Sequence, residues 1–182
     1  MKRLNKIILT ISALFLIVGC GNMMNTPTKK VEEFLSKYQT MDKEVLSQLD
    51  EVITDAGNLN DSQKDTYRDL MKKQYQNLSY KIKDETEDGN NANVLVEIEV
   101  YDYGKAIRDS ETYLTTNRDE FLRDDSSEVD TVKFLDYKIG KMKEVKDKIT
   151  YTINFTLTKV NDEWQLDNIN DVDRQKLHGL YY

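Results

Sequence analysis

The chain has 182 residues and carries 33 acidic against 26 basic side chains, a net charge of −7. Nucleic acid would repel such a chain, and the sequence has no basic stripe to overturn this, so we expect no nucleic-acid partner. Cys20 is the only cysteine, which excludes an intramolecular disulfide and a thiolate metal site.

Residues 1–19 have the pattern of a bacterial lipoprotein leader. A positive n-region comes first, formed by Lys2, Arg3 and Lys6. The apolar run from Ile7 to Val18 that follows is too short for a comfortable membrane span. It ends in a lipobox-like motif made of Ile17, Val18, Gly19 and Cys20. We therefore predict that a signal peptidase recognises Ile17, Val18 and Gly19, and that the Cys20 thiol takes a diacylglyceryl thioether.

The alternatives are an uncleaved anchor helix and a plain secretory signal with an incidental cysteine. Lipidation is favoured because the apolar run stops at Cys20 and polar Gly21 follows at once. Two acyl chains, such as palmitate, give a stable membrane anchor. We expect a lipid-anchored protein on the extracytoplasmic side of the cell membrane, with a removed signal peptide (1–19), a lipidated tether (20–26) and a single domain (27–182).

Two helices are predicted at the start of this domain. Thr26 and Pro27 suit the N-cap and the first position of a helix, and apolar residues then recur at helical spacing. A second helix is predicted from about Asp42 to Thr54. Gly57 and Asn58 are expected to end it.

A third helix and a β-hairpin follow. Asn60 and Gln63 have the spacing of a capping box, and the apolar stripe behind them is interrupted only by polar Gln74. The period then changes from 3.6 to 2, with a turn predicted at residues 88–90. The apolar positions of this hairpin are Tyr80, Ile82, Val94, Val96, Ile98 and Val100.

The helical pattern returns from Gly104 and is predicted to run to a charged break at residues 123–125. Residues 128–146 are ambiguous, because apolar residues recur every three or four positions but Gly140 is a poor helix former and Tyr137 could begin a strand. We predict a helix here.

The last hairpin has the clearest pattern in the chain. Apolar residues alternate strictly with polar ones from Ile149 to Thr158, and Asn161 and Asp162 can form a two-residue turn. That turn places Leu157 opposite Leu166 on the apolar face. A short final helix is predicted to end at Gly179. Since neither hairpin is stable alone, we predict an α+β fold with helices packed on one face of an antiparallel sheet built from both hairpins.

The sequence resembles small Gram-positive lipoproteins. Four segments carry the resemblance: residues 26–34, the strand Tyr151 to Lys159, residues 164–167 and residues 173–181. It implies a cone-shaped domain similar to the nuclear-transport-factor-2-like or cystatin-like folds, leaves the strand order open, and supplies no catalytic residue. Folds of this type host enzymes and binding modules alike.

The sequence offers little catalytic chemistry. His178 is the only histidine, and we interpret it as a tail residue beside Gly179 rather than a base or ligand, because no serine motif is present to meet it. The glycines are too dispersed for a phosphate-binding loop. We therefore predict no catalytic residue, no cofactor and no metal site.

Two oxygen-rich stretches invite a calcium interpretation. Residues 84–89 mimic part of an EF-hand loop, but Leu95 occupies the position that needs a bidentate glutamate. A solvated hairpin turn is the favoured interpretation, with calcium as the alternative. The same holds for the second stretch, whose members are Asp167, Asn170, Asp171 and Asp173.

A non-catalytic binding or interaction module is thus the favoured function, and a carboxylate-based hydrolase or isomerase with a pocket in the fold is the alternative. The predicted partners are membrane lipid, through acylated Cys20, and a protein partner or second copy through the outer sheet face. That face would carry Glu97, Glu99, Thr150, Thr152, Asn154, Thr156, Thr158 and Gln165. A plain solvated face is the alternative for these side chains.

Overall fold

The computed structural model describes residues 25–55, 59–124 and 126–182. The predicted leader and lipobox, the stop signal at Gly57 and Asn58, and Asp125 lie outside these residues. The elements in chain order are α1 (Pro27–Gln39), α2 (Lys43–Asp55), α3 (Asp61–Gln76), β1 (Ser79–Asp88), β2 (Asn91–Tyr101), α4 (Tyr103–Thr116), η1 (Arg118–Phe121), α5 (Thr131–Glu144), β3 (Lys148–Val160), β4 (Glu163–Leu166) and α6 (Asp171–His178).

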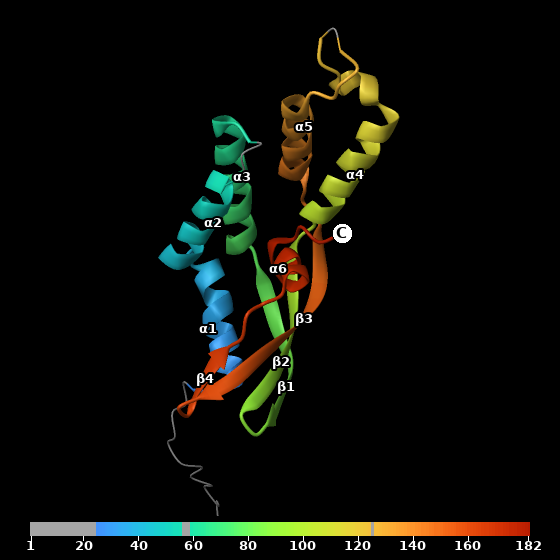
Figure 1. Cartoon of the computed structure of the whole chain (residues 1–182). Helices are drawn as coiled ribbons and strands as arrows, with labels where there is room; N and C mark the ends of the chain where they lie inside the picture. Colours follow the sequence, from blue (N-terminus) through green and yellow to red (C-terminus); the bar gives the residue numbers. More distant parts are fainter. Residues whose placement is uncertain (1–24, 56–58, 125) are drawn as a thin grey trace, which may run out of the picture.

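The sheet is antiparallel and has the order β1-β2-β3-β4. The two hairpins therefore lie side by side, joined through the long β2–β3 ladder, in which Val94 pairs with Phe155 and Val96 pairs with Ile153 (Figure 1). The second turn is the one predicted: Asn161 and Asp162 both have positive φ. Leu157 pairs with Leu166, which confirms the predicted register.

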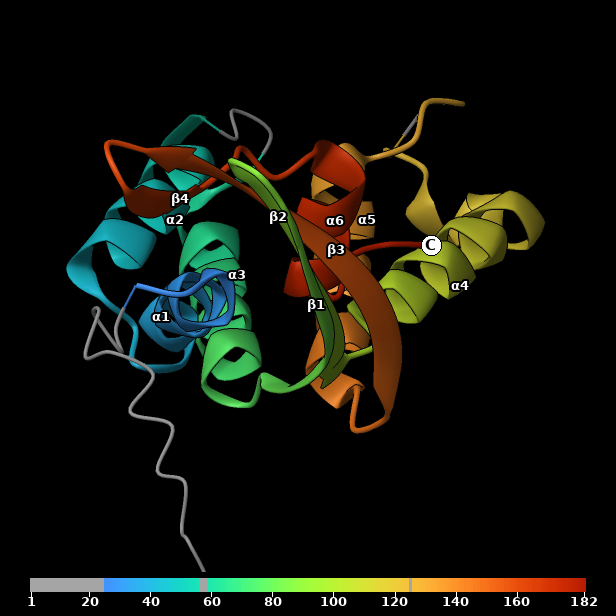
Figure 2. The same cartoon turned by 90° about the horizontal axis from the view of Figure 1, so that it is seen from below.

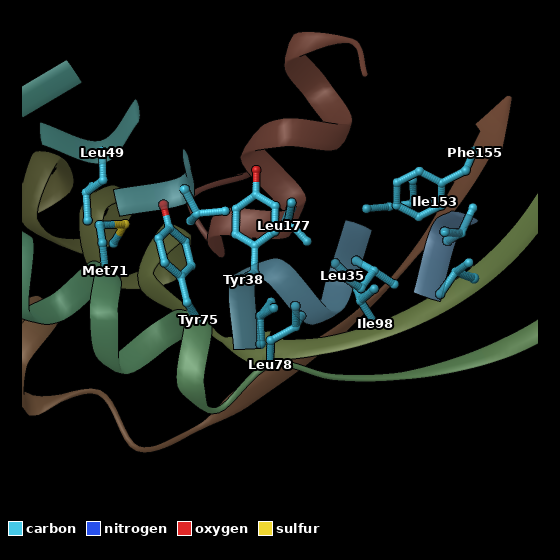
Figure 3. Packing of buried hydrophobic residues seen from close by; sticks show 14 of the residues in the cluster. Leu35, Tyr38, Leu49, Met71, Tyr75, Leu78, Ile98, Ile153, Phe155 and Leu177 are labelled. Carbon is cyan, nitrogen blue, oxygen red and sulfur yellow. The ribbon is translucent and has the colours of Figure 1, made fainter. Parts of the chain in front are cut away.

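Helices pack on one face of this sheet, so the predicted α+β class is confirmed. α1 contacts β1, β2 and β4, and α6 contacts β2. The inward-facing strand residues are buried; among them are Val94, Val96, Ile98, Ile153, Phe155 and Leu157. They join residues of α1, α2 and α3 in one hydrophobic core, part of which Figure 3 shows.

The predicted helix starts at α1 and α3 are confirmed. The Thr26 side chain accepts a hydrogen bond from the Lys29 amide, and Pro27 occupies the first turn of α1. Asn60 and Gln63 form the reciprocal bonds of a capping box. The Gln63 amide also donates to Asp136 in α5 over 2.8 Å, so the same residue ties α3 to α5.

The acidic run at residues 84–88 belongs to β1 and not to a turn, which corrects the sequence interpretation. The turn itself is shorter and comprises Gly89 and Asn90. A bulge between Ile82 and Asp84 shifts the β1 register, so that Glu85 pairs with inward-facing Val94. Glu85 can then accept a hydrogen bond from the Thr28 amide over 2.9 Å, at the positive N-terminal end of α1.

The helix predicted from Gly104 ends earlier than expected, at Thr116, and a separate 3₁₀ turn follows as η1. The prediction was wrong there because the apolar spacing continues past the end of the helix. The Thr116 hydroxyl and the Asn117 side-chain amide both donate to the Tyr113 carbonyl, a side-chain pattern that competes with helical bonding. Residues Thr131–Glu144 are helical, which confirms the choice made for the ambiguous segment.

The molecule has two ends. The β1–β2 and β3–β4 turns lie at one end, and the connection between α4 and α5 lies at the other (Figure 1). α5 packs between α3 and α4, while α2 and α4 lie on opposite sides of the molecule (Figure 2). Within residues 25–55, 59–124 and 126–182, no helix is long and apolar enough to cross a membrane.

Candidate functional site

The predicted lipidation site falls on residues that the structure does not describe. Cys20 and the recognition residues Ile17, Val18 and Gly19 precede Asn25, the first described residue. Lipidation therefore stays a prediction. The candidate site that the structure itself offers is a different one.

A groove of about 660 Å³ opens between α1, α2, α3, α6 and the segment that follows β4. Its volume is within the usual range for small-molecule sites. We call it the α6 groove. Apolar and aromatic side chains form most of its walls, among them Phe34, Tyr38, Leu49, Tyr67, Met71 and Tyr75.

Aromatic rings line the base of the α6 groove. The rings of Phe34 and Tyr38 are 5.2 Å apart, and those of Tyr38 and Tyr75 are 5.1 Å apart with edge-to-face geometry. Figure 3 shows the hydroxyl groups of Tyr38 and Tyr75 pointing to the same side, with Leu49 and Met71 beyond Tyr75 and Leu177 beside Tyr38. Helical spacing on α1 and α3 places these rings, because both tyrosines lie on the apolar stripes that face the core.

Gln74 fixes one end of α6 at this groove. Its side chain is fully buried, and its Nε2 donates to the carbonyls of Tyr101 and His178 over 3.1 and 2.9 Å. The Tyr101 amide donates back to Gln74 Oε1 over 2.8 Å. This polar residue on the apolar stripe of α3 thus holds β2 and α6 together. Gly179 ends the helix with φ +68°, in a space that a β-carbon could not share with Gln74 and the Tyr101 carbonyl.

His178 is the last residue of α6 and lines the groove. Its Nδ1 lies 2.9 Å from the Tyr75 hydroxyl. Burial, with a smaller contribution from the Arg174 charge, lowers the pKa of His178 to about 4. Burial also raises the pKa of Tyr75 well above its ordinary value. At neutral pH both groups are therefore uncharged. His178 lies beside Gly179 at the end of the last helix, as the sequence predicted, but its ring packs against Tyr75, which the sequence did not indicate.

The charged groups of the groove are Glu51 on α2 and Asp171 and Arg174 on α6. Arg174 Nη2 donates to the Ile169 carbonyl over 3.1 Å. Burial raises the pKa of Tyr38, and the nearby Arg174 charge opposes that rise. Arg174 therefore acts electrostatically on both Tyr38 and His178, although it is itself exposed.

The arrangement suits binding better than acid–base chemistry. A neutral imidazole with a pKa near 4 is a weak base at neutral pH. Among the hydrogen bonds of the described residues, the His178 ring bonds to Tyr75 and to no carboxylate. The groove therefore presents apolar walls, a few neutral polar groups, one guanidinium and the carboxylates of Glu51 and Asp171.

The oxygen-rich stretches have local structural roles. Asn170 caps α6 by accepting from the Asp173 amide, and Asp173 accepts from the Lys176 ammonium. Asp167 accepts from the Thr158 hydroxyl. In the described part of the chain, no three His, Cys, Asp or Glu side chains are grouped to hold a metal ion.

The outer sheet face is where the sequence predicted it. Glu99, Thr150, Thr152, Asn154, Thr156 and Gln165 are exposed, while Glu97 and Thr158 are half-buried. Asn154 donates to Asn93 across the β2–β3 ladder, and Glu97 pairs with Lys83 on β1. A partner or a second copy on this face stays a prediction.

No protein-family model, curated protein or solved structure matches the chain. The resemblance to small Gram-positive lipoproteins therefore stays a prediction, and the geometry of the molecule has to carry the functional argument.

Sequence reasoning missed the roles of two groove residues, His178 and Arg174, and of Gln74, which is buried behind them. Gln74 was noted only as an interruption of an apolar stripe, His178 as a tail residue, and Arg174 was not singled out. Gln74 carried a usable signal, since a polar residue on a buried stripe needs hydrogen-bond partners from another element. For His178 and Arg174 the signal is tertiary, because α6 meets α1 and α3 only in the folded chain.

Proposed function

We propose that this chain is a lipid-anchored extracytoplasmic protein that acts at the membrane surface as a non-catalytic binding module. The α6 groove carries the binding part of this proposal, because apolar walls with a few placed polar groups are the usual composition of a ligand site. The anchoring part rests on the sequence, in which Ile17, Val18 and Gly19 precede Cys20.

The position of Asn25 supports a short connection to such an anchor. Its side-chain amide donates to the Asp162 carbonyl over 2.7 Å and accepts from the Trp164 amide over 2.9 Å. The five residue steps from Cys20 to Asn25 reach at most roughly 17 Å. A lipid on Cys20 would therefore hold the end that carries the β-turns nearest the membrane and direct the α4–α5 end away from it (Figure 1).

The alternative is a carboxylate-based hydrolase or isomerase working in the same groove. Such chemistry needs two ionisable groups that meet at the reacting atoms. Glu51 and Asp171 both line the groove, on α2 and α6, yet neither carboxylate accepts a hydrogen bond from a described residue that would hold it in place for catalysis. We favour the binding role for this reason.

Two measurements test the proposal. Cys20→Ala should release the protein from the membrane fraction into the medium, with Ser36→Ala as a control that keeps the anchor. Retention of Cys20→Ala in the membrane would contradict the anchor.

Crosslinking in intact cells followed by affinity capture should recover the same partner from the unaltered protein and from a Glu51→Gln, Asp171→Asn double variant. Loss of turnover of an identified substrate in the double variant, with folding intact, would favour the enzyme.

The outer sheet face is the second contact surface that we propose. Related cone-shaped folds commonly pair through their sheets, and this face is broad, exposed and rich in threonine. Light scattering over a range of concentrations tests the version with a second copy. A mass that stays at that of one chain up to high concentration would remove it.

A further inference from the structure

Among the described residues that line the α6 groove, Arg174 is the only lysine or arginine. It forms no ion pair with a carboxylate of the described residues, although Asp171 lies three positions earlier on the same helix. Its guanidinium keeps most of its five N–H donors for other partners, since one nitrogen bonds to the Ile169 carbonyl. Tyr38 and His178 line the same groove, and the Arg174 charge lowers the pKa of both groups.

His178 supplies a second, neutral donor. The Tyr75 hydroxyl keeps its proton, because burial raises its pKa, and its one hydrogen-bond partner among the described side chains is His178 Nδ1. The hydroxyl can therefore donate to Nδ1, and we assign the tautomer in which it does. A neutral imidazole then carries its proton on Nε2, which leaves an N–H donor on a ring that lines the groove.

The walls that α2 and α3 contribute to the groove are largely apolar. Leu49 and Met71 are buried, and Val52 is 64% exposed at the α2 side of the groove, which is unusual for a large apolar side chain on a stripe that otherwise faces the core. A ligand that covered Val52 would remove that apolar surface from water. Glu51 and Asp171 add two negative charges to the lining against the single positive charge of Arg174. An anionic group is therefore attracted only at the guanidinium itself, and a second negative charge on the ligand would add to the repulsion by the two carboxylates.

Building on the binding role proposed above, we propose that the α6 groove binds a small amphiphilic monoanion of the fatty-acid class, with its apolar chain along Val52, Leu49 and Met71 and its carboxylate at Arg174. A guanidinium matches the two oxygens of a carboxylate in a paired geometry. The Nε2–H of His178 can donate to the same oxygens. A free fatty acid and an acyl chain of an intact lipid share the apolar part, but only the free acid presents a carboxylate.

The test uses membranes from cells that produce the full chain. A fatty acid carrying a diazirine and an alkyne is added, the sample is irradiated, and the labelled peptides are mapped by mass spectrometry. We expect labelling that depends on irradiation in peptides of α2, α3 and α6. Arg174→Gln should lower it roughly tenfold, as expected for the loss of a charged hydrogen bond. Arg174→Lys should keep part of it, and Arg108→Gln, an exposed arginine of α4, should leave it unchanged.

Competition experiments distinguish a carboxylate ligand from neutral and cationic amphiphiles, and a free fatty acid from the acyl chain of an intact lipid. Decanoate should displace the probe at least about tenfold better than decanol or decylammonium, and a probe whose carboxylate is blocked as an amide should label the groove poorly. Equal competition by decylammonium, equal labelling by the blocked probe, or labelling unaffected by Arg174→Gln would overturn the proposal. Release of Cys20→Ala from the same membranes reports the anchor independently, so failure of the groove and failure of the anchor give different results.

Discussion

The sheet-and-groove body and the α4–α5 arm are built in different ways. The body, formed by α1, α2, α3, α6 and the sheet, shares one core whose residues come from distant parts of the chain. The arm contributes Tyr103, Ile139 and Met142 to that core. At its far end it has a separate aromatic cluster, formed by Tyr113, Phe121, Phe134 and Tyr137.

This difference indicates which parts of the molecule should unfold together. Long-range contacts make the body a single unit, because a defect in α6 reaches β2 and α3 through Gln74. The distal aromatic cluster joins residues of neighbouring elements only, so it can open without the sheet. The four predictions below test that contrast.

The largest effect is expected at Gln74. Gln74→Leu would leave the Tyr101 amide, the Tyr101 carbonyl and the His178 carbonyl without their partner. Buried polar groups that lose their partners cost about 1–3 kcal/mol each, so the loss of three such bonds should lower the unfolding free energy of the whole protein in urea by at least about 3 kcal/mol. Gln76→Leu, an exposed position in the same helix, is the matched control and should be nearly neutral.

Lowering the pH should reduce the stability of the body, because the buried His178 resists protonation. Its pKa is about 4 in the folded protein and near 6.5 in an unfolded chain. Between these values the unfolded chain binds a proton that the folded protein does not. Unfolding free energy should therefore fall as the pH drops from 6.5 to 4, by on the order of 3 kcal/mol in total. Denaturant titrations at several pH values check this, and His178→Gln should lose this part of the slope. Equal slopes for both proteins would contradict it.

The arm should respond locally. Phe121 is 3% exposed and packs edge-to-face on Phe134 and Tyr137. Phe121→Ala should speed amide hydrogen exchange in η1 and the first turns of α5 at least about tenfold, while the slowest amides of β2 and β3 keep their protection. Phe155→Ala, in the body, should speed exchange throughout. A uniform response to Phe121→Ala would show that the arm and the body unfold as one unit.

The smallest expected effect is a gain in unfolding free energy. Gly140 lies inside α5, and a β-carbon there would meet no atom within 4 Å. Gly140→Ala should raise unfolding free energy by about 1 kcal/mol, because alanine costs less backbone entropy in a helix. Gly179→Ala, in the body, should instead lower the unfolding free energy, because Gly179 has positive φ and a β-carbon there would collide with the Gln74 side chain. Thermal melts of both variants test the pair.

The body was also the more predictable region from the sequence. Strict alternation in β3 and a two-residue turn determine register without any tertiary knowledge, and the caps at Thr26 and Asn60 mark helix starts locally. The arm was less clear, because apolar spacing persists where side chains of Thr116 and Asn117 end the helix. The groove was not predictable as a site. Periodicity identifies the face of a helix, but not which other helix meets it, so Tyr75, His178 and Arg174 come together only in the fold.

The bonds of Asn25 have a mechanical consequence. Tension applied to the N-terminal end of the described chain reaches Asn25 before α1, so its two hydrogen bonds, to the Asp162 carbonyl and from the Trp164 amide, take up the load first. That load passes into the tip of the β3–β4 hairpin, one edge of the sheet. The rest of the load passes along the backbone into α1, which carries Phe34 and Tyr38 of the α6 groove.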